Sequence, residues 1–150
     1  MQVDVVQIEL RVTGNINITG SGYIYQAKDA AQIFVDRIGK CNVENVGMLC
    51  MDSTGKIINY SAVSIGDVDN VQVKTEQIIK TALLSNASKI IIAHNHPSGV
   101  LSITGPDIKI TKHIGAAAKL MGIELMDSLI VNAKGEMLAI RSHIRELECE

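Results

Sequence analysis

A short apolar run that ends at a proline places the strongest constraint on how this chain can fold. Residues 90–93 are apolar at four successive positions and lead directly into His94, Asn95, His96 and Pro97. Such a run is typical of a strand buried on both faces of a sheet. Because Pro97 has no backbone N–H, it cannot continue a central strand, and the chain must turn away there. The sequence therefore predicts a central strand with two imidazoles at its carboxyl end.

The other hydrophobic patterns predict strands and helices on both sides of this strand in the sequence. Helical spacing of apolar residues predicts helices over 27–38, over 75–87 and from 105 or 106 to 121, with glycines at 39 and 122 ending the first and third. Strand patterns cover 2–12, 43–51, 56–65, 89–94, 123–131 and 136–140, and the polar tail 142–150 is predicted as a short helix or a frayed end. We therefore expect an α/β fold with a mixed central sheet flanked by helices.

Composition limits the kind of protein that the chain can be. With 150 residues and 47% hydrophobic content, we expect a single domain over 1–150 with a full core. Cys41, Cys50 and Cys149 are odd in number and have no CxxC spacing, which favours reduced thiols in a cytoplasmic protein. We see neither a signal-peptide pattern nor an apolar run of membrane-spanning length, so we expect no membrane partner.

The charge balance argues against strong non-specific binding to nucleic acid. The formal net charge is -2 and the chain has no run of lysines and arginines. Such binding usually depends on a basic patch that neutralises phosphates. Direct nucleic-acid binding is therefore not expected.

The two histidines and a downstream aspartate have the spacing of a metal site. Side chains two residues apart on a strand point to the same side of the sheet, which brings together His94 and His96. Asp107 lies in the first turn of the predicted third helix and could project back toward them. Two imidazoles and a carboxylate suit Zn²⁺ and leave its fourth position for water. This pattern predicts the catalytic zinc site of a small metal-dependent hydrolase.

Each of these residues also has a structural interpretation. A lone histidine at a strand end is more often structural than a ligand. Thr104 and Asp107 form a helix-capping pattern, and taken alone this pattern favours capping over metal binding. The two roles are compatible, since the cap can hold the helix start while the carboxylate reaches an ion. We expect His113 and His143 at the surface.

A hydrolytic site also needs a base beside the water that the metal activates. Glu44 stands at the start of the predicted strand 43–51, and Glu76 stands in the predicted second helix. Sequence spacing alone does not choose between these two carboxylates.

The same residues resemble a known family. The spacing His94-x-His96-Pro97, six residues, Thr104, two residues, Asp107 is similar to the JAMM signature HxHP-x6-S-x-x-D of the JAB/MPN+ metalloproteases. Residues 90–99 resemble the bacterial RadC branch of that family. Residues 44–52 are similar to the strand that carries the family's glutamate, and 122–127 resemble the strand after the third helix. The resemblance covers about residues 25–140.

The resemblance implies a function and a role for each residue. His94, His96 and Asp107 would bind zinc, Glu44 would be the general acid and base, and Thr104 would stand where the family's serine stabilises an oxyanion. The implied fold is a mixed sheet between helices, JAB/MPN-like and related to cytidine deaminases, although their PCxxC element is absent here. Peptide or isopeptide bonds are the implied substrates, and DNA-repair proteins are the implied partners.

The chain also departs from the family pattern. Thr104 replaces serine, residues 100–103 are unusually apolar, and Ser128 stands where RadC members usually have histidine. We expect no counterpart of the N-terminal helix-hairpin-helix region. Two other functions stay open: a non-enzymatic interaction module associated with DNA repair or recombination, and a DNA-processing enzyme, against which the net charge argues. A homodimer could form through strand edges or residues 2–12.

Overall fold

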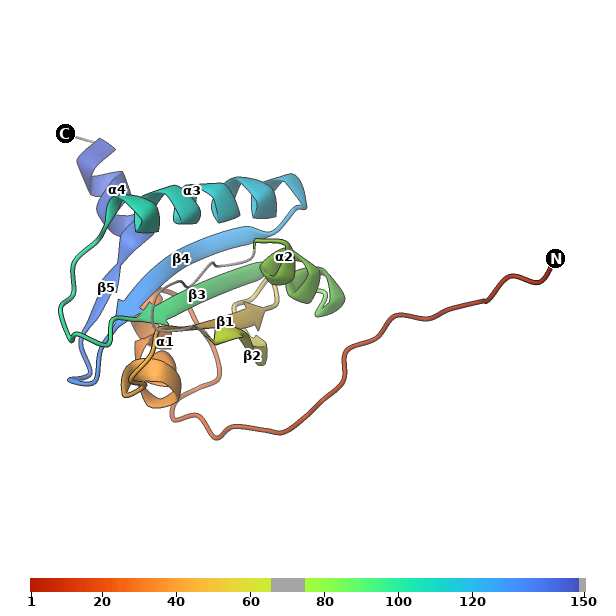
Figure 1. Cartoon of the computed structure of the whole chain (residues 1–150), viewed down its shortest axis with the longest axis horizontal. Helices are drawn as coiled ribbons and strands as arrows, with labels where there is room; N and C mark the ends of the chain where they lie inside the picture. The colour runs from red at the N-terminus through yellow and green to blue at the C-terminus, as the bar shows by residue number, and fades with distance from the viewer. Residues whose placement is uncertain (66–74, 149–150) are drawn as a thin grey trace.

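A five-stranded mixed sheet, with helices on both faces, forms the centre of the molecule (Figure 1). The structure is a computed structural model that describes residues 1–65 and 75–148. The strands, in the spatial order β2-β1-β3-β4-β5, are β1 (Asn45–Met51), β2 (Ile57–Ile65), β3 (Lys89–Asn95), β4 (Glu124–Val131) and β5 (Met137–Ala139). The helices are α1 (Ala27–Phe34), the π-helix η1 (Val35–Gly39), α2 (Thr75–Leu84), α3 (Gly105–Leu120) and α4 (Ile140–Glu148). The predicted fold class is confirmed.

The apolar run at 90–93 forms the middle of the sheet, as predicted. β3 pairs antiparallel with β1 on one side and parallel with β4 on the other. Ile90 and Ile92 face one hydrophobic cluster, while Ile91 and Ala93 face the other, and all four are buried. Because β3 and β4 are parallel, α3 connects them as a crossover helix packed on one face of the sheet. This crossover brings the start of α3 back to the carboxyl end of β3.

Each face of the sheet has its own core. α1 and η1 cover one face, where Phe34 packs in a cluster with residues of β1, β3 and β4. α2 and α3 cover the other face, where Ile78 and Ile114 pack against the sheet. α4 lies beside α3 and packs Ile144 against Ile130 of β4 in a third cluster. The candidate metal ligands described below lie on the α3 face.

A buried carboxylate explains why the polar tail forms a helix. Asp127 of β4 is 2% exposed, and its oxygens accept hydrogen bonds from the backbone N–H groups of Arg141 (2.7 Å) and Ser142 (3.2 Å). The Ser142 hydroxyl also donates to this carboxylate over 2.6 Å. A helix start leaves N–H groups without partners inside the helix, and an anion there stabilises it. Asp127 therefore anchors α4 to the sheet.

The strand predicted over residues 2–12 is wrong. The structure gives these residues no secondary structure, and Figure 1 shows the N-terminal segment trailing away from the sheet. Alternation of apolar residues can favour an extended chain, but a strand also needs a neighbouring strand for its hydrogen bonds. The segment has no such neighbour in the described single chain.

The first helix also ends differently from the prediction. It continues from α1 into η1, which includes Gly39 instead of stopping before it. A Cβ atom at Gly39 would lie 2.8 Å from the backbone oxygen of Asn132, so this position needs glycine for a close approach.

Cys149 lies outside the described residues. Within the described ranges, no helix combines the length and apolar character needed to cross a membrane.

Candidate metal centre

The end of β3 carries both histidines of the predicted site. His94 pairs with Val46 on the α3 face of the sheet and is 7% exposed. His96 follows the strand, and its backbone N–H donates to the Val131 carbonyl over 3.1 Å. Gly99 then donates to the His96 carbonyl over 2.9 Å with a φ of +81°, which closes a tight turn. Strand and turn together fix the backbone on both sides of His96.

The start of α3 supplies the aspartate. Thr104 is the N-cap residue, and its hydroxyl oxygen accepts a hydrogen bond from the Asp107 N–H over 3.3 Å. In return, Asp107 Oδ2 accepts a hydrogen bond from the Thr104 N–H over 3.0 Å. This reciprocal capping box holds the carboxylate at the helix start and limits its rotation.

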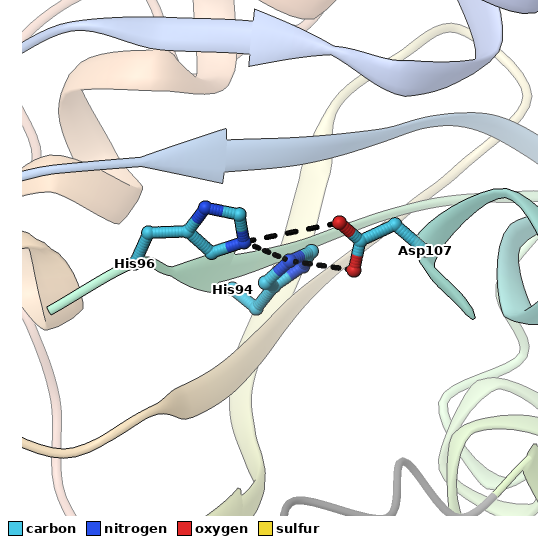
Figure 2. A group of neighbouring side chains, drawn as sticks. All are labelled: His94, His96 and Asp107. Carbon is cyan, nitrogen blue, oxygen red and sulfur yellow. Dashed lines mark hydrogen bonds and ion pairs between the residues drawn. The ribbon is translucent and has the colours of Figure 1, made fainter. Parts of the chain in front are cut away.

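The three side chains converge, as Figure 2 shows. The Nε2 atoms of His94 and His96 lie 3.1 Å apart. Asp107 places Oδ1 3.3 Å from His94 Nε2 and Oδ2 3.8 Å from His96 Nε2. Ligands of a tetrahedral zinc, with bonds of about 2.0–2.1 Å, lie about 3.3 Å from one another. The donor types and their spacing therefore fit three ligands of a zinc ion with one position left open.

The outer nitrogen of His96 is also held. His96 Nδ1 lies 2.9 Å from the Val100 carbonyl oxygen, which can only accept a hydrogen bond. Nδ1 must therefore carry the proton, and in neutral His96 the lone pair is on Nε2, the nitrogen that faces the other two residues. Metal-binding histidines commonly have such an outer partner, which fixes their orientation.

The environment of Asp107 favours its charged form. Partial burial acts to raise the pKa of Asp107, but hydrogen bonds from His94 and from the Thr104 backbone outweigh that effect and hold the pKa at about 2. The carboxylate is therefore ionised at neutral pH and needs to lose no proton before it binds a cation.

Glu44, the predicted base, is far from the histidines in sequence and does not belong to the cluster. It immediately precedes β1 and is half-buried. Among the residues that the structure describes, its side chain has no hydrogen bond or ion pair. β1 pairs Val46 with His94, so continuing this antiparallel register by two residues would bring Glu44 opposite His96 on the same face. Its role as acid and base stays a prediction.

Asn95, between the two histidines, is the residue that sequence reasoning missed. It is fully buried, and its Oδ1 accepts a hydrogen bond from the Asn45 N–H over 2.6 Å. Its Nδ2 donates to the carbonyls of Cys41 (3.1 Å) and Val43 (3.0 Å). These three bonds fasten the segment that carries Glu44 to the end of β3. The signal was present, because a polar residue between two same-face residues must point to the opposite, buried face.

Among the described residues, the remaining candidates lie outside the group formed by His94, His96 and Asp107. Thr104 is exposed, and its hydroxyl oxygen serves the helix cap. Glu76, the alternative base, is exposed in the first turn of α2. His113 and His143 are exposed, as predicted.

Comparisons with known proteins match most of this chain. The family model of the RadC-like JAB domain matches residues 24–145. The chain is similar to a UPF0758 protein of Finegoldia magna, with 36% identity over 107 residues, covering 71% of this chain and 48% of the relative. It is 31% identical over 108 residues to a UPF0758 protein of Clostridium acetobutylicum, covering 72% of this chain and 47% of the relative. The chain therefore spans about half the length of these curated relatives.

Proposed function

This chain belongs to the family of RadC-like JAB domains, and on that premise we propose that it is a zinc-dependent hydrolase of the JAMM type that cleaves peptide or isopeptide bonds. One observation carries the proposal: a ligand nitrogen of His94, one of His96 and a carboxylate oxygen of Asp107 all lie within 4.8 Å of one another. Two neutral imidazoles and one carboxylate form the ligand set of several zinc hydrolases.

The chain orients these donors through its own contacts. The capping box holds Asp107, and the Val100 carbonyl holds His96. When bound, zinc supplies a Lewis acid that polarises the amide carbonyl and lowers the pKa of a water molecule to about 7. Because Asp107 and His96 are already held in place by these contacts, we expect the site to need little rearrangement to take up the ion.

Two further residues would handle protons and charge. Glu44 would accept a proton from the attacking water while the water oxygen bonds to the carbonyl carbon. It would then deliver that proton to the leaving nitrogen as the C–N bond breaks. Thr104 accepts a hydrogen bond in the helix cap through its oxygen, which leaves its O–H hydrogen free to donate to the developing oxyanion.

Metal content and hydrolysis, measured on the same preparations, test the proposal. We expect about one zinc per native chain by plasma mass spectrometry, and none in a variant with His94→Ala and His96→Ala. We expect Glu44→Gln to keep its zinc but to lose hydrolysis of a fluorogenic peptide library and of a lysine-linked isopeptide by about a hundredfold or more. His113→Ala is the matched control, because His113 is exposed on α3 outside the cluster.

The outcomes separate the mechanism from the alternatives. Zinc in the native chain with full hydrolysis by Glu44→Gln would contradict the role of Glu44. Zinc in the native chain with no hydrolysis of any of these bonds would favour an interaction module that works with DNA-repair or recombination proteins. Absence of zinc after reconstitution would overturn the metal site.

A further inference from the structure

Residues 6–13 have the pattern of an amphipathic strand. Even-numbered positions are apolar and odd-numbered positions are polar throughout the segment. The apolar residues are Val6, Ile8, Leu10 and Val12, and the polar residues are Gln7, Glu9, Arg11 and Thr13. In an extended chain, all four apolar side chains would lie on one face.

This segment has no partner within the described chain. Residues 1–20 form no hydrogen bond with any other described residue. Ile8 is 74% exposed and Val12 is 86% exposed, and Figure 1 shows the segment running clear of the sheet. An extended segment with unpaired N–H and C=O groups is a template for pairing with another strand.

The apolar stripe does not end with the exposed segment. Ile16 and Ile18 are the next even-numbered apolar residues, and both pack against the core cluster on the α1 face. The apolar side chains that follow the segment are therefore seated on the domain, while those within it are exposed.

We propose that residues 6–14 pair antiparallel with the same residues of a second copy of this chain, around a two-fold axis through Leu10. In this register, Glu9 of each copy lies opposite Arg11 of the other, so two opposite-charge pairs form. On the other face, Ile8 lies opposite Val12, and Leu10 lies opposite its own counterpart. Opposite charges and apolar pairs across strands both stabilise a sheet, and a two-fold interface uses the same patch on both copies.

The charges exclude the neighbouring arrangements. Shifting the antiparallel register by two residues in either direction places Glu9 opposite Glu9 or Arg11 opposite Arg11. A shift by one residue places charged residues opposite apolar ones. In-register parallel pairing places like charges side by side. Like charges directly opposite each other destabilise a strand pair, so the two-fold register through Leu10 is selected.

Charge reversal tests this register directly. Glu9→Arg and Arg11→Glu each place like charges opposite one another in a homodimer, but a mixture of the two variants restores both opposite-charge pairs. Asp4→Arg is the matched control, since it makes the same change of charge in the N-terminal segment but lies outside the paired residues 6–14. Light scattering after size exclusion would give the mass across a dilution series, and native mass spectrometry would identify the heterodimer.

We expect the native chain and the Asp4→Arg control to have twice the 16.2 kDa mass of one chain. Each reversal alone should weaken the dimer about tenfold or more, and the equimolar mixture should form a heterodimer of native affinity. A native chain that is monomeric at every concentration would overturn the proposal. A dimer that both reversals leave unchanged would also overturn it, because the contact would then lie elsewhere, such as the exposed edge of β2.

Discussion

At the scale of single residues, Asp107 links the helix start to the candidate metal site. One of its oxygens accepts a hydrogen bond from the N–H of Thr104, while the other lies 3.3 Å from His94 Nε2. Both neighbours stabilise the charged form of the carboxylate. Its folded-state pKa, at about 2, is therefore lower than the ordinary value of 3.8. A lowered carboxyl pKa makes stability depend on pH in a definite direction.

In the metal-free protein, we expect the stabilisation from Asp107 to be complete above about pH 4 and to be lost as the pH falls toward 2. In that window the unfolded chain takes up the proton before the folded chain does, so acid favours unfolding. The contribution is about 1–2 kcal/mol after allowance for solvent screening. Urea unfolding of native protein and of Asp107→Asn measures it: the difference in unfolding free energy should shrink across this window. A difference that stays constant would contradict the assignment.

Asn95 should matter for both stability and turnover. Asn95→Ala removes three hydrogen bonds to the segment 41–45, and we expect a loss of about 2–4 kcal/mol in unfolding free energy. Its side chain faces away from the histidines, so zinc content should be unchanged. Hydrolysis should fall because Glu44 is no longer held in place. Asn59→Ala is the control, because it also removes a part-buried asparagine amide but breaks only its hydrogen bond from β2 to Ser85. A folded Asn95→Ala protein with native turnover would contradict this positioning role.

At the scale of elements, local patterns predicted most of the fold because they agreed with the tertiary contacts. Residues 90–93 are buried on both faces of the sheet, and β3, to which they belong, pairs with a strand on each side. Residues 2–12 carry an equally clear pattern but meet no strand within the described chain. Alternation of apolar and polar residues predicts which side chains share a face of a strand. It does not predict which strand will pair with it, because that partner can be distant in sequence.

The site could be predicted to the extent that it is contiguous in sequence. His94, His96 and Asp107 lie within one stretch, and their spacing indicated a metal site. Glu44 is fifty residues before His94 in the chain (94 − 44), and the resemblance to a family, not spacing, singled it out. The contacts of Asn95 cross a similar separation, which no local pattern describes.

Two glycines should respond oppositely to the same substitution. Gly39→Ala would place a methyl group 2.8 Å from the Asn132 carbonyl oxygen, and we expect it to lower the unfolding free energy by about 1–3 kcal/mol. At Gly115, inside α3, an added methyl meets only Leu125 at 3.6 Å. Gly115→Ala should raise the unfolding free energy by about 0.5–1 kcal/mol. Urea denaturation of both variants checks the pair, and a stabilising Gly39→Ala would show that η1 can move away from the β4–β5 turn.

At the scale of the whole molecule, apolar side chains alone build the two main clusters of the described core. Two hydrophobic clusters fill the two faces of the sheet, and none of the three candidate ligands belongs to either cluster. The three ligands also contact one another directly. This arrangement is that of a site added to a folded scaffold.

We therefore expect chelation of zinc to lower the melting temperature without unfolding the protein at room temperature. An ion that binds to an already folded protein stabilises it by an amount that depends on the ion's concentration relative to its Kd. A structural zinc instead supplies the free energy that folds the protein. Near-ultraviolet circular dichroism and thermal unfolding, before and after chelation, measure both effects. Collapse of the tertiary signal on chelation would identify a structural site instead.

The division of the site between two stretches of chain has an evolutionary consequence. The three ligands lie within residues 94–107, whereas Glu44 belongs to a segment fastened to the end of β3 by one asparagine side chain. Under the proposed function, changes at the three candidate ligands would act on ion retention, whereas changes at Glu44, or at Asn95 that holds its segment, would act on proton transfer. Under the same proposal, a lineage that lost only Glu44 would keep a folded domain with its three candidate ligands in place. In this architecture, descent from an enzyme to a non-catalytic binding protein needs only one change.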